Sequence, residues 1–120
     1  MDKMIGIFLE EITKFWEKIV EDLKSNWELN RNADHIIYGA GVYGSLIYQY
    51  LSQWGKVRCF IDRNHYVQGK HVSGLSILSP DEVDISGSNI WFGINPSIAT
   101  DLAVDFIANR PVNSYYCLGT

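Results

Sequence analysis

The chain has 120 residues, of which 47% are hydrophobic and 20% are charged, and its formal net charge is −4. These values are typical of one globular domain with its own core and exclude a disordered chain. The ten Lys and Arg residues are scattered among fourteen acids, which argues against a nucleic-acid partner. We also expect no membrane span, because no apolar run approaches about twenty residues. We expect no secretory signal, because the N-terminus lacks a basic region followed by a smooth apolar run.

The first thirty residues predict a long amphipathic helix. Apolar residues recur along it in alternating steps of four and three, at Ile5, Leu9, Ile12, Trp16, Ile19 and Leu23. The acidic polar face argues against attachment to an anionic membrane surface. This stripe either docks on the chain's own domain or pairs with the same helix of a second copy in a homodimer, which the 3.5-residue repeat suits. We place the helix at residues 1–30 and an α/β domain at residues 31–120.

From His35 onward, strand-like apolar runs alternate with helical patterns, which predicts a parallel sheet covered on both faces. We expect strands at 35–39, 57–61, 75–78, 89–94 and 114–118. Helices are expected at 42–54, from Ser79-Pro80 onward, and from Asn95-Pro96 to about 108. Right-handed crossovers favour the strand order 3-2-1-4-5, so the predicted fold is a Rossmann-like, three-layer α/β fold with about five parallel strands and an extra N-terminal amphipathic helix.

A glycine-rich turn follows the first predicted strand. Residues 36–44 read I-I-Y-G-A-G-V-Y-G and contain the spacing G-x-G-x-x-G. In such a strand–turn–helix unit the first glycine permits the tight turn, the second lets a pyrophosphate approach the backbone, and the third lets the helix pack on the strand. The sequence predicts these roles for Gly39, Gly41 and Gly44, with the phosphates at the amino end of the helix.

An acidic residue ends the second predicted strand. Asp62 follows the turn by about twenty residues, which is the spacing of an acid that binds ribose hydroxyls. Arg63 beside it is suited to a 2′-phosphate, so the choice between NAD and NADP stays open, with Asp62 favouring the unphosphorylated ribose. Residues after the fourth strand would line the other wall of the crevice. The predicted binding residues are Gly39, Ala40, Gly41, Val42, Tyr43, Gly44, Asp62, Arg63, Gly93 and Asn95.

Other residues with a chemical signature receive no functional assignment. Tyr66 and Lys70 have the Tyr-x-x-x-Lys spacing of short-chain dehydrogenases, but they lie in a predicted loop where they would share no helical face. His65 and His71 beside them have no neighbours with metal-ligand spacing. Cys59 and Cys117 are expected to be buried free thiols of a cytoplasmic protein. We therefore assign no catalytic residue and no metal site. 

Three segments resemble a recurring bacterial pattern: residues 36–44, F-I-D-R-N at 60–64, and Q-G-K-H-V-S-G-L-S-I-L-S-P-D-E at 68–82. They are similar to the N-terminal nucleotide-binding domain of sugar acetyltransferases of the sialic-acid O-acetyltransferase type. They are also similar to the NAD-binding segment of nucleotide-sugar dehydratases and epimerases of polysaccharide biosynthesis. The resemblance covers about residues 34–118 and implies a nucleotide sugar or NAD as ligand, with the three glycines at the phosphates and Asp62 at the ribose or base end. The hexapeptide-repeat and catalytic parts of those enzymes have no counterpart in the sequence.

These observations predict a nucleotide-binding module of sugar-nucleotide or polysaccharide biosynthesis, with NAD(P) or a UDP-sugar as its ligand. One alternative is a small NAD(P)-dependent sugar-nucleotide dehydrogenase or epimerase whose substrate pocket is completed by dimerisation. A second is a structural domain that docks a partner through its first helix. A site for S-adenosylmethionine also uses a glycine turn and an acid, but the seven-stranded sheet of those methyltransferases is not predicted here.

Overall fold

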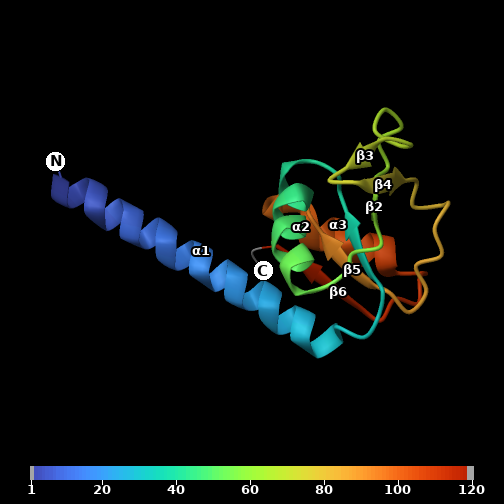
Figure 1. Ribbon diagram of the computed structural model, residues 1–120, viewed down its shortest axis with the longest axis horizontal. Coiled ribbons are helices and arrows are strands. Elements are labelled where there is room, and N and C mark those ends of the chain that lie inside the picture. The colour runs from blue at the N-terminus through green and yellow to red at the C-terminus, as the bar shows by residue number, and fades with distance from the viewer. Residues whose placement is uncertain (1, 119–120) are drawn as a thin grey trace.

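A computed structural model describes residues 2–118, which form a six-stranded sheet with helices on both faces and a long N-terminal helix that extends beyond it (Figure 1). The helices are α1 (Asp2–Asn30), α2 (Val42–Trp54) and α3 (Pro96–Ile107). The strands are β1 (His35–Tyr38), β2 (Cys59–Ile61), β3 (His71–Val72), β4 (Leu75–Leu78), β5 (Asn89–Phe92) and β6 (Ser114–Cys117). The α/β class is as predicted, and the sheet is mostly parallel.

The strand order is β3-β4-β2-β1-β5-β6, so the prediction of five strands was wrong in count, and the full order differs from 3-2-1-4-5 by one added edge strand. The five predicted strands, now β1, β2, β4, β5 and β6, keep their predicted relative order. The difference is β3, which pairs antiparallel with β4 at the edge of the sheet. Ser73 and Gly74 both adopt positive φ angles, 52° and 81°, and turn the chain back within two residues. Two such residues form the tight turn of a β-hairpin. From the sequence, no strand is expected between residues 61 and 75.

The helix predicted from Ser79 onward is also wrong. The Ser79 N–H donates to Oε1 of Glu82 at 3.1 Å, and the Asp81 N–H donates to Oγ of Ser79 at 3.3 Å, so the expected capping bonds do form. They close only a turn at residues 80–83. The residues that follow, Val-Asp-Ile-Ser-Gly, are poor helix formers, and Ile85 packs into the core instead. The crossover from β4 to β5 therefore contains no helix along residues 79–88, all of which the structure describes.

Different helices cover the two faces of the sheet (Figure 1). On one face, Leu23 and Trp27 of α1 share a hydrophobic cluster with Ile47 and Leu51 of α2. On the other face, α3 contributes a cluster that includes Ala99, Ala103 and Phe106 and that also takes in Ile85 from the β4–β5 crossover. The carboxyl half of α1 is thus a part of the core of the α/β fold.

Polar contacts fix the carboxyl end of α1 against the sheet. The side chain of Asn89 donates to the carbonyl oxygen of Asn30 at 2.6 Å, and Asn113 donates to Oδ1 of Asn89 at 2.7 Å. The rings of Trp27 and His35 stack with their centroids 4.0 Å apart. These contacts hold the last turns of α1 at the beginning of β1. The domain boundary at residue 30 stays a prediction.

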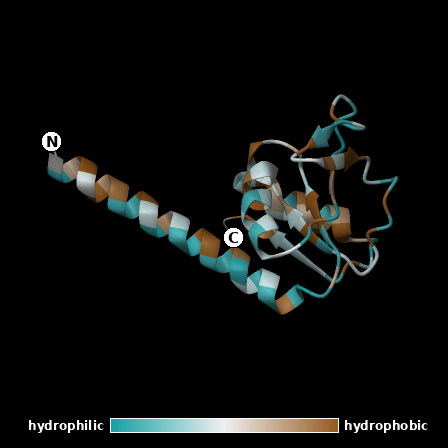
Figure 2. Ribbon diagram, in the orientation of Figure 1, coloured by the Kyte–Doolittle hydropathy of each residue, from teal (hydrophilic) through white to brown (hydrophobic). Residues whose placement is uncertain are grey.

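The amino-terminal half of α1 projects away from the sheet, and its apolar side chains stay exposed (Figure 2). The predicted apolar stripe is therefore divided: Ile19 and Leu23 are buried on the chain's own domain, whereas Leu9 and Ile12 face solvent. Neither α1 nor any other helix within residues 2–118 is both long and apolar enough to cross a membrane.

Candidate functional site

Three glycines let backbone segments touch at the carboxyl edge of the sheet. Gly39 has φ +102°, and a Cβ on it would lie 2.6 Å from the carbonyl oxygen of Gly93. A Cβ on Gly44 would overlap the carbonyl oxygen of Gly39, and one on Gly93 would lie 2.6 Å from the Gly44 nitrogen. The ends of β1 and β5 and the first turn of α2 are therefore in direct backbone contact, and the chain's own packing requires glycine at all three positions.

Gly41 is different, because nothing in the described chain requires a glycine there. Apart from its chain neighbours Ala40 and Val42, no residue within 2–118 has an atom within 4 Å of a Cβ built on Gly41. Its φ of −93° and its extended conformation are open to other residues as well. Gly41 is the N-cap of α2, so the missing side chain leaves open space directly in front of the amino end of this helix.

The amino ends of the two helices at this edge differ. At α3, Oδ1 of Asn95 accepts hydrogen bonds from the N–H of Ser97 at 3.0 Å and from its hydroxyl at 2.9 Å. At α2, no side chain within residues 2–118 makes the corresponding cap at Gly41, and the first turn contains no acidic residue. The first N–H groups of α2 are thus uncapped by side chains and carry the positive end of the helix dipole. Asn95, a predicted ligand contact, serves here as a helix cap.

The structure brings Asp62 to the glycine turn, as the predicted site requires. Oδ2 of Asp62 accepts the Ala40 N–H at 3.0 Å, and Oδ1 accepts the Asn64 N–H at 2.9 Å. Asp62 therefore holds the turn in place, a role that the sequence analysis did not foresee. Each carboxylate oxygen can accept a second hydrogen bond, so the half-buried Asp62 retains acceptor capacity toward a hydroxyl group.

Two cations lie beyond Asp62, and only one of them was predicted. The guanidinium of Arg63 lies 5.7 Å from the ring centroid of Phe106, and that of Arg110 lies 4.1 Å from it. Arg110 follows α3, far from the glycine turn in sequence, so no local motif marks it. A cavity of about 400 Å³ is lined by Arg63, His65, Gln68, Ser79, Pro80, Asp81 and Arg110. Its charge is partly balanced, because Asp81 lies 3.8 Å from Arg110.

Tyr38, the last residue of β1, is buried beneath these charges. Burial raises the pKa of its phenol above the ordinary value; Arg63 and Arg110 oppose the shift, and Asp62 reinforces it. The phenol therefore stays neutral at physiological pH.

The remaining predicted residues lie on the outer side of the turn. Val42 is exposed and Tyr43 is exposed by 38%, so neither belongs to the core. A shallow groove of about 490 Å³ runs along the start of α2, lined by Gly41, Val42, Ser45, Leu46 and Gln49. The open position at Gly41 continues into this groove, so a ligand bound at the turn would also contact the start of α2.

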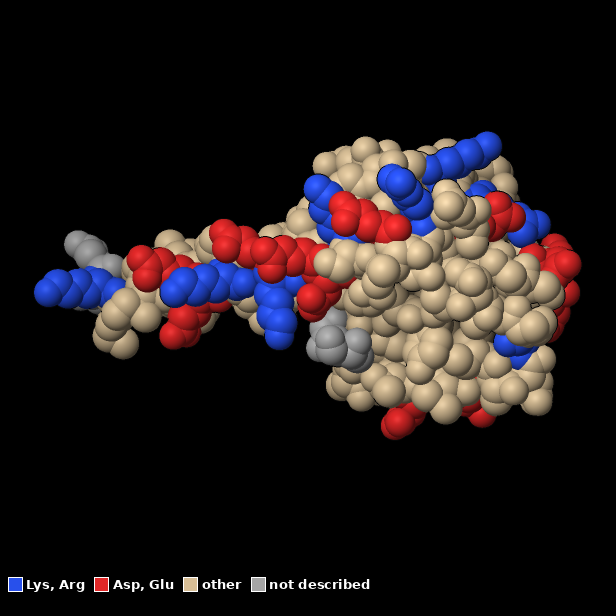
Figure 3. All heavy atoms as spheres, turned by 90° about the horizontal axis from the view of Figure 1, so that it is seen from below, with Lys and Arg blue, Asp and Glu red and all other residues tan. Residues whose placement is uncertain are grey.

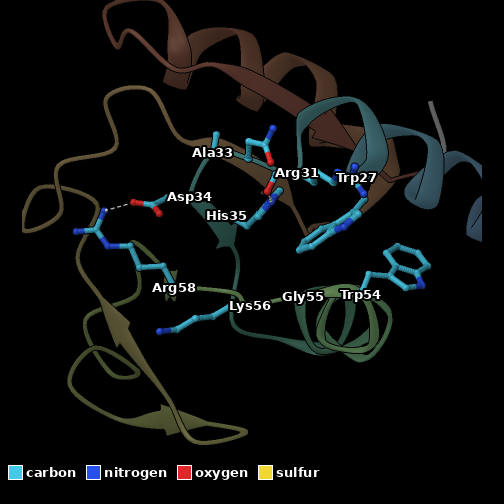
Figure 4. Close-up of a pocket in the computed structure, with 10 residues that line it drawn as sticks. Trp27, Arg31, Ala33, Asp34, His35, Trp54, Gly55, Lys56 and Arg58 are labelled. Carbon is cyan, nitrogen blue, oxygen red and sulfur yellow. Dashed lines mark hydrogen bonds and ion pairs between the residues drawn. The ribbon is translucent and has the colours of Figure 1, made fainter.

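A separate cavity of about 500 Å³ lies at the opposite ends of the strands, where β1 begins (Figure 4). Its lining includes Trp27 and Trp54, and Arg58 at its rim pairs with Asp34 at 3.8 Å. Both α1 and α2 end here, so the negative ends of two helix dipoles point toward the cavity and disfavour an anion. Its cations include Arg31 and Lys56, which follow these helix ends and offset the dipoles. None of the predicted binding residues lines it.

The two cysteines are not part of the candidate site. Cys59 and Cys117 are buried, as expected, and burial raises the pKa of both thiols. Within residues 2–118, no group of three or more His, Cys, Asp or Glu side chains is placed to hold a metal ion.

Comparison with known proteins bears on this geometry at the level of the fold. A crystal structure of UDP-D-quinovosamine 4-dehydrogenase from Vibrio fischeri is similar, with a TM-score of 0.54 and 21% sequence identity. The match covers 68% of this chain and 75% of that chain. At this identity the likeness shows a Rossmann-like fold. No protein-family model and no curated protein matches the sequence.

Proposed function

We propose that the chain is a nucleotide-binding domain that binds NAD(P) or a nucleotide sugar at the turn between β1 and α2. The observation that carries the proposal is the open space at Gly41. The fold requires Gly39, Gly44 and Gly93 for its own packing, but it does not require a glycine at position 41. A phosphate group that approaches the backbone there accounts for the absence of a side chain.

The other residues of the site fit the same ligand. The uncapped N–H groups of the first turn of α2 would donate to the phosphates. Asp62, hydrogen-bonded to the turn at Ala40, would accept from a ribose hydroxyl. Arg63 and Arg110 beyond it offer positive charge to an additional phosphate, if the ligand carries one.

The printed activity of the similar structure, a dehydrogenase of a UDP-sugar, supports a ligand from nucleotide-sugar metabolism. The segments that resemble polysaccharide-biosynthesis enzymes point the same way. We therefore propose a role in bacterial sugar-nucleotide or polysaccharide biosynthesis, as a binding module and without an assigned catalytic residue.

Isothermal titration with NAD, NADP and UDP-sugars tests this proposal. We expect one of these classes to bind, and we expect Gly41→Ala to weaken that binding at least tenfold. Gly6→Ala is a matched control, because a Cβ at Gly6 also meets no atom within 4 Å in residues 2–118 apart from its own stretch of helix, and Gly6 lies in α1, away from the turn. Failure of all three ligand classes to bind, or wild-type affinity in Gly41→Ala, would contradict the proposal.

A further inference from the structure

The projecting half of α1 carries an apolar surface that is large for a monomeric protein. Seven side chains on it are between 47% and 77% exposed: Met4, Ile5, Ile7, Phe8, Leu9, Ile12 and Phe15. Their combined surface is on the order of 800 Å², which is what each partner buries in a standard interface. The largest apolar patch of a typical monomer is about 300–600 Å².

The same segment has little to stabilise it as an isolated helix. The buried contacts of α1 begin near Ile19 and continue through Leu23 and Trp27, where the helix packs on the sheet. The preceding residues extend into solvent (Figure 1). Single helices shorter than about 12–15 residues are marginal in water, and most helical stability in proteins comes from packing of an apolar face. 

We propose that the outer half of α1, residues 3–15, pairs with the same segment of a second copy of this chain. The apolar side chains repeat every three to four residues, as a pair of helices requires. The exposed stripe is also continuous with the buried stripe that already docks α1 on its own domain. The area and the repeat together fit a second copy, because the exposed stripes of the two copies would then cover each other. This inference is independent of the nucleotide site.

The charges along this segment allow self-association. Acidic and basic side chains lie side by side on the projecting helix (Figure 3). Residues 3–18 contain three lysines and three glutamates, so their side chains carry no net charge. These residues are Lys3, Lys14, Lys18, Glu10, Glu11 and Glu17. Two copies can therefore approach without like-charge repulsion, which would oppose pairing if the segment carried one sign of charge.

The position of the α/β domain decides the direction of pairing. From Trp16 onward the stripe faces the chain's own domain, and Nε1 of Trp16 donates to the hydroxyl of Tyr50 in α2 at 2.9 Å. A parallel partner on the exposed stripe would run directly into this domain. An antiparallel partner avoids it, because its own domain then lies beyond the far end of the helix. The pairing is therefore antiparallel, with its two-fold axis near Leu9.

Sedimentation velocity of the full chain at micromolar and higher concentrations tests the pairing. We expect the wild type to have twice the monomer mass, and we expect the double variant Leu9→Lys/Ile12→Lys to be monomeric. The double variant Glu10→Gln/Glu11→Gln removes two negative charges from the polar face, which changes the net charge by the same amount, and should remain a dimer. A monomeric wild type, or loss of the dimer in this control, would overturn the proposal. Near-ultraviolet circular dichroism of each variant verifies that the tryptophan-containing core is intact.

Cysteine cross-linking tests the direction independently of stability. The native Cys59 and Cys117 are buried, so they contribute little background under mild oxidation. Leu9→Cys, near the two-fold axis, should form a disulfide with its own copy. Ile5→Cys should not link to itself but should link to Ile12→Cys in a mixture, because a two-fold axis near Leu9 places these two positions opposite each other. Efficient self-linking of Ile5→Cys would show a parallel pair and would overturn the antiparallel arrangement.

Discussion

The indole Nε1–H of Trp91 donates a hydrogen bond to Nδ1 of His35 at 3.1 Å, inside the core where β5 lies beside β1. An indole nitrogen can only donate, so Nδ1 of His35 must be unprotonated and its ring hydrogen must lie on Nε2. That nitrogen lies 3.3 Å from the carbonyl oxygen of Arg31, which accepts the bond. The neutral imidazole thus connects the end of α1 to the sheet, and burial lowers the pKa of His35.

This arrangement predicts a loss of stability in mild acid. Because the pKa of His35 is lower in the folded state, the unfolded chain takes up a proton more readily as the pH falls. The contribution of neutral His35 to the free energy of unfolding is therefore complete above about pH 6.5, the pKa of a histidine in the unfolded chain. It is lost as the pH falls below this value toward the pKa of His35 in the folded state. Urea unfolding between about pH 7.5 and pH 5 measures this change.

Two variants separate His35 from the other histidines. His35→Gln removes the titrating group, so it should lower stability at neutral pH but flatten the dependence on pH across this window. His71→Gln, at an exposed position, should leave the wild-type dependence unchanged. The same pH dependence in His35→Gln and the wild type would show that another group is responsible.

Alanine substitutions at two glycines of the turn should have different effects on stability. In Gly44→Ala the new methyl group would overlap the carbonyl oxygen of Gly39, so the helix must shift away from the strand. We expect a loss of about 1–3 kcal/mol or more. Gly41→Ala meets no described atom within 4 Å and should unfold at a denaturant concentration equal to or above that of the wild type. Equal destabilisation by the two substitutions would contradict the division between a packing glycine and an open one.

Asp62→Asn should affect both stability and ligand binding. An amide has one acceptor oxygen, whereas the carboxylate accepts from the backbone N–H groups of Ala40 and Asn64. We expect a loss of about 1–3 kcal/mol in unfolding free energy and weaker nucleotide binding by titration calorimetry. Asp84→Ala is the control: Oδ1 of Asp84 accepts the Ser86 N–H at 3.0 Å outside the predicted site, so this change should weaken one turn without changing affinity. Wild-type affinity in Asp62→Asn would argue against a ribose contact at this residue.

Docking of α1 on the sheet can be tested with two leucines of the same helix. Leu23 is 1% exposed and Leu29 is 82% exposed. Leu23→Ala leaves a cavity between α1 and the sheet and should reduce the free energy of unfolding by about 2–5 kcal/mol. Leu29→Ala should change it by less than about 0.5 kcal/mol. Similar values for both, measured by urea unfolding at a fixed protein concentration, would mean that α1 is not part of the cooperative unit.

The sequence was informative where hydrophobic pattern and backbone chemistry agree. Alternation of buried strands and helical patterns identified the α/β class, and the spacing of the glycine turn and Asp62 placed two distant segments at one edge of the sheet. Both depend on local rules: parallel strands end at the same edge, and a tight strand-to-helix turn needs glycine. The placement of Asp62 beside Ala40 follows from them.

The remaining features depend on tertiary packing, which competes with local sequence preferences and cannot be derived from a local pattern. Ser79 and Glu82 form the hydrogen bonds of a helix start, but burial of Ile85 and a short connection prevent a helix. The Ser73-Gly74 hairpin turn was hidden in a polar loop, although its serine–glycine pair is a turn signal. Arg110 is distant from the glycine turn in sequence, and only the folding of α3 against the sheet brings it to the site. The division of the α1 stripe at about Trp16 was likewise invisible, because the buried and exposed halves have the same periodicity.

The crossover without a helix between β4 and β5 makes the protection of the backbone uneven across the sheet. β1 and β5 are paired on both sides with strands of the parallel sheet, whereas β4 has only the two-residue antiparallel β3 on its outer side. The crossover that follows β4 is held by turns and has no helix along residues 79–88. In hydrogen exchange, the amides of β3 and β4 should open together and early, and those of β1 and β5 should exchange only with global unfolding.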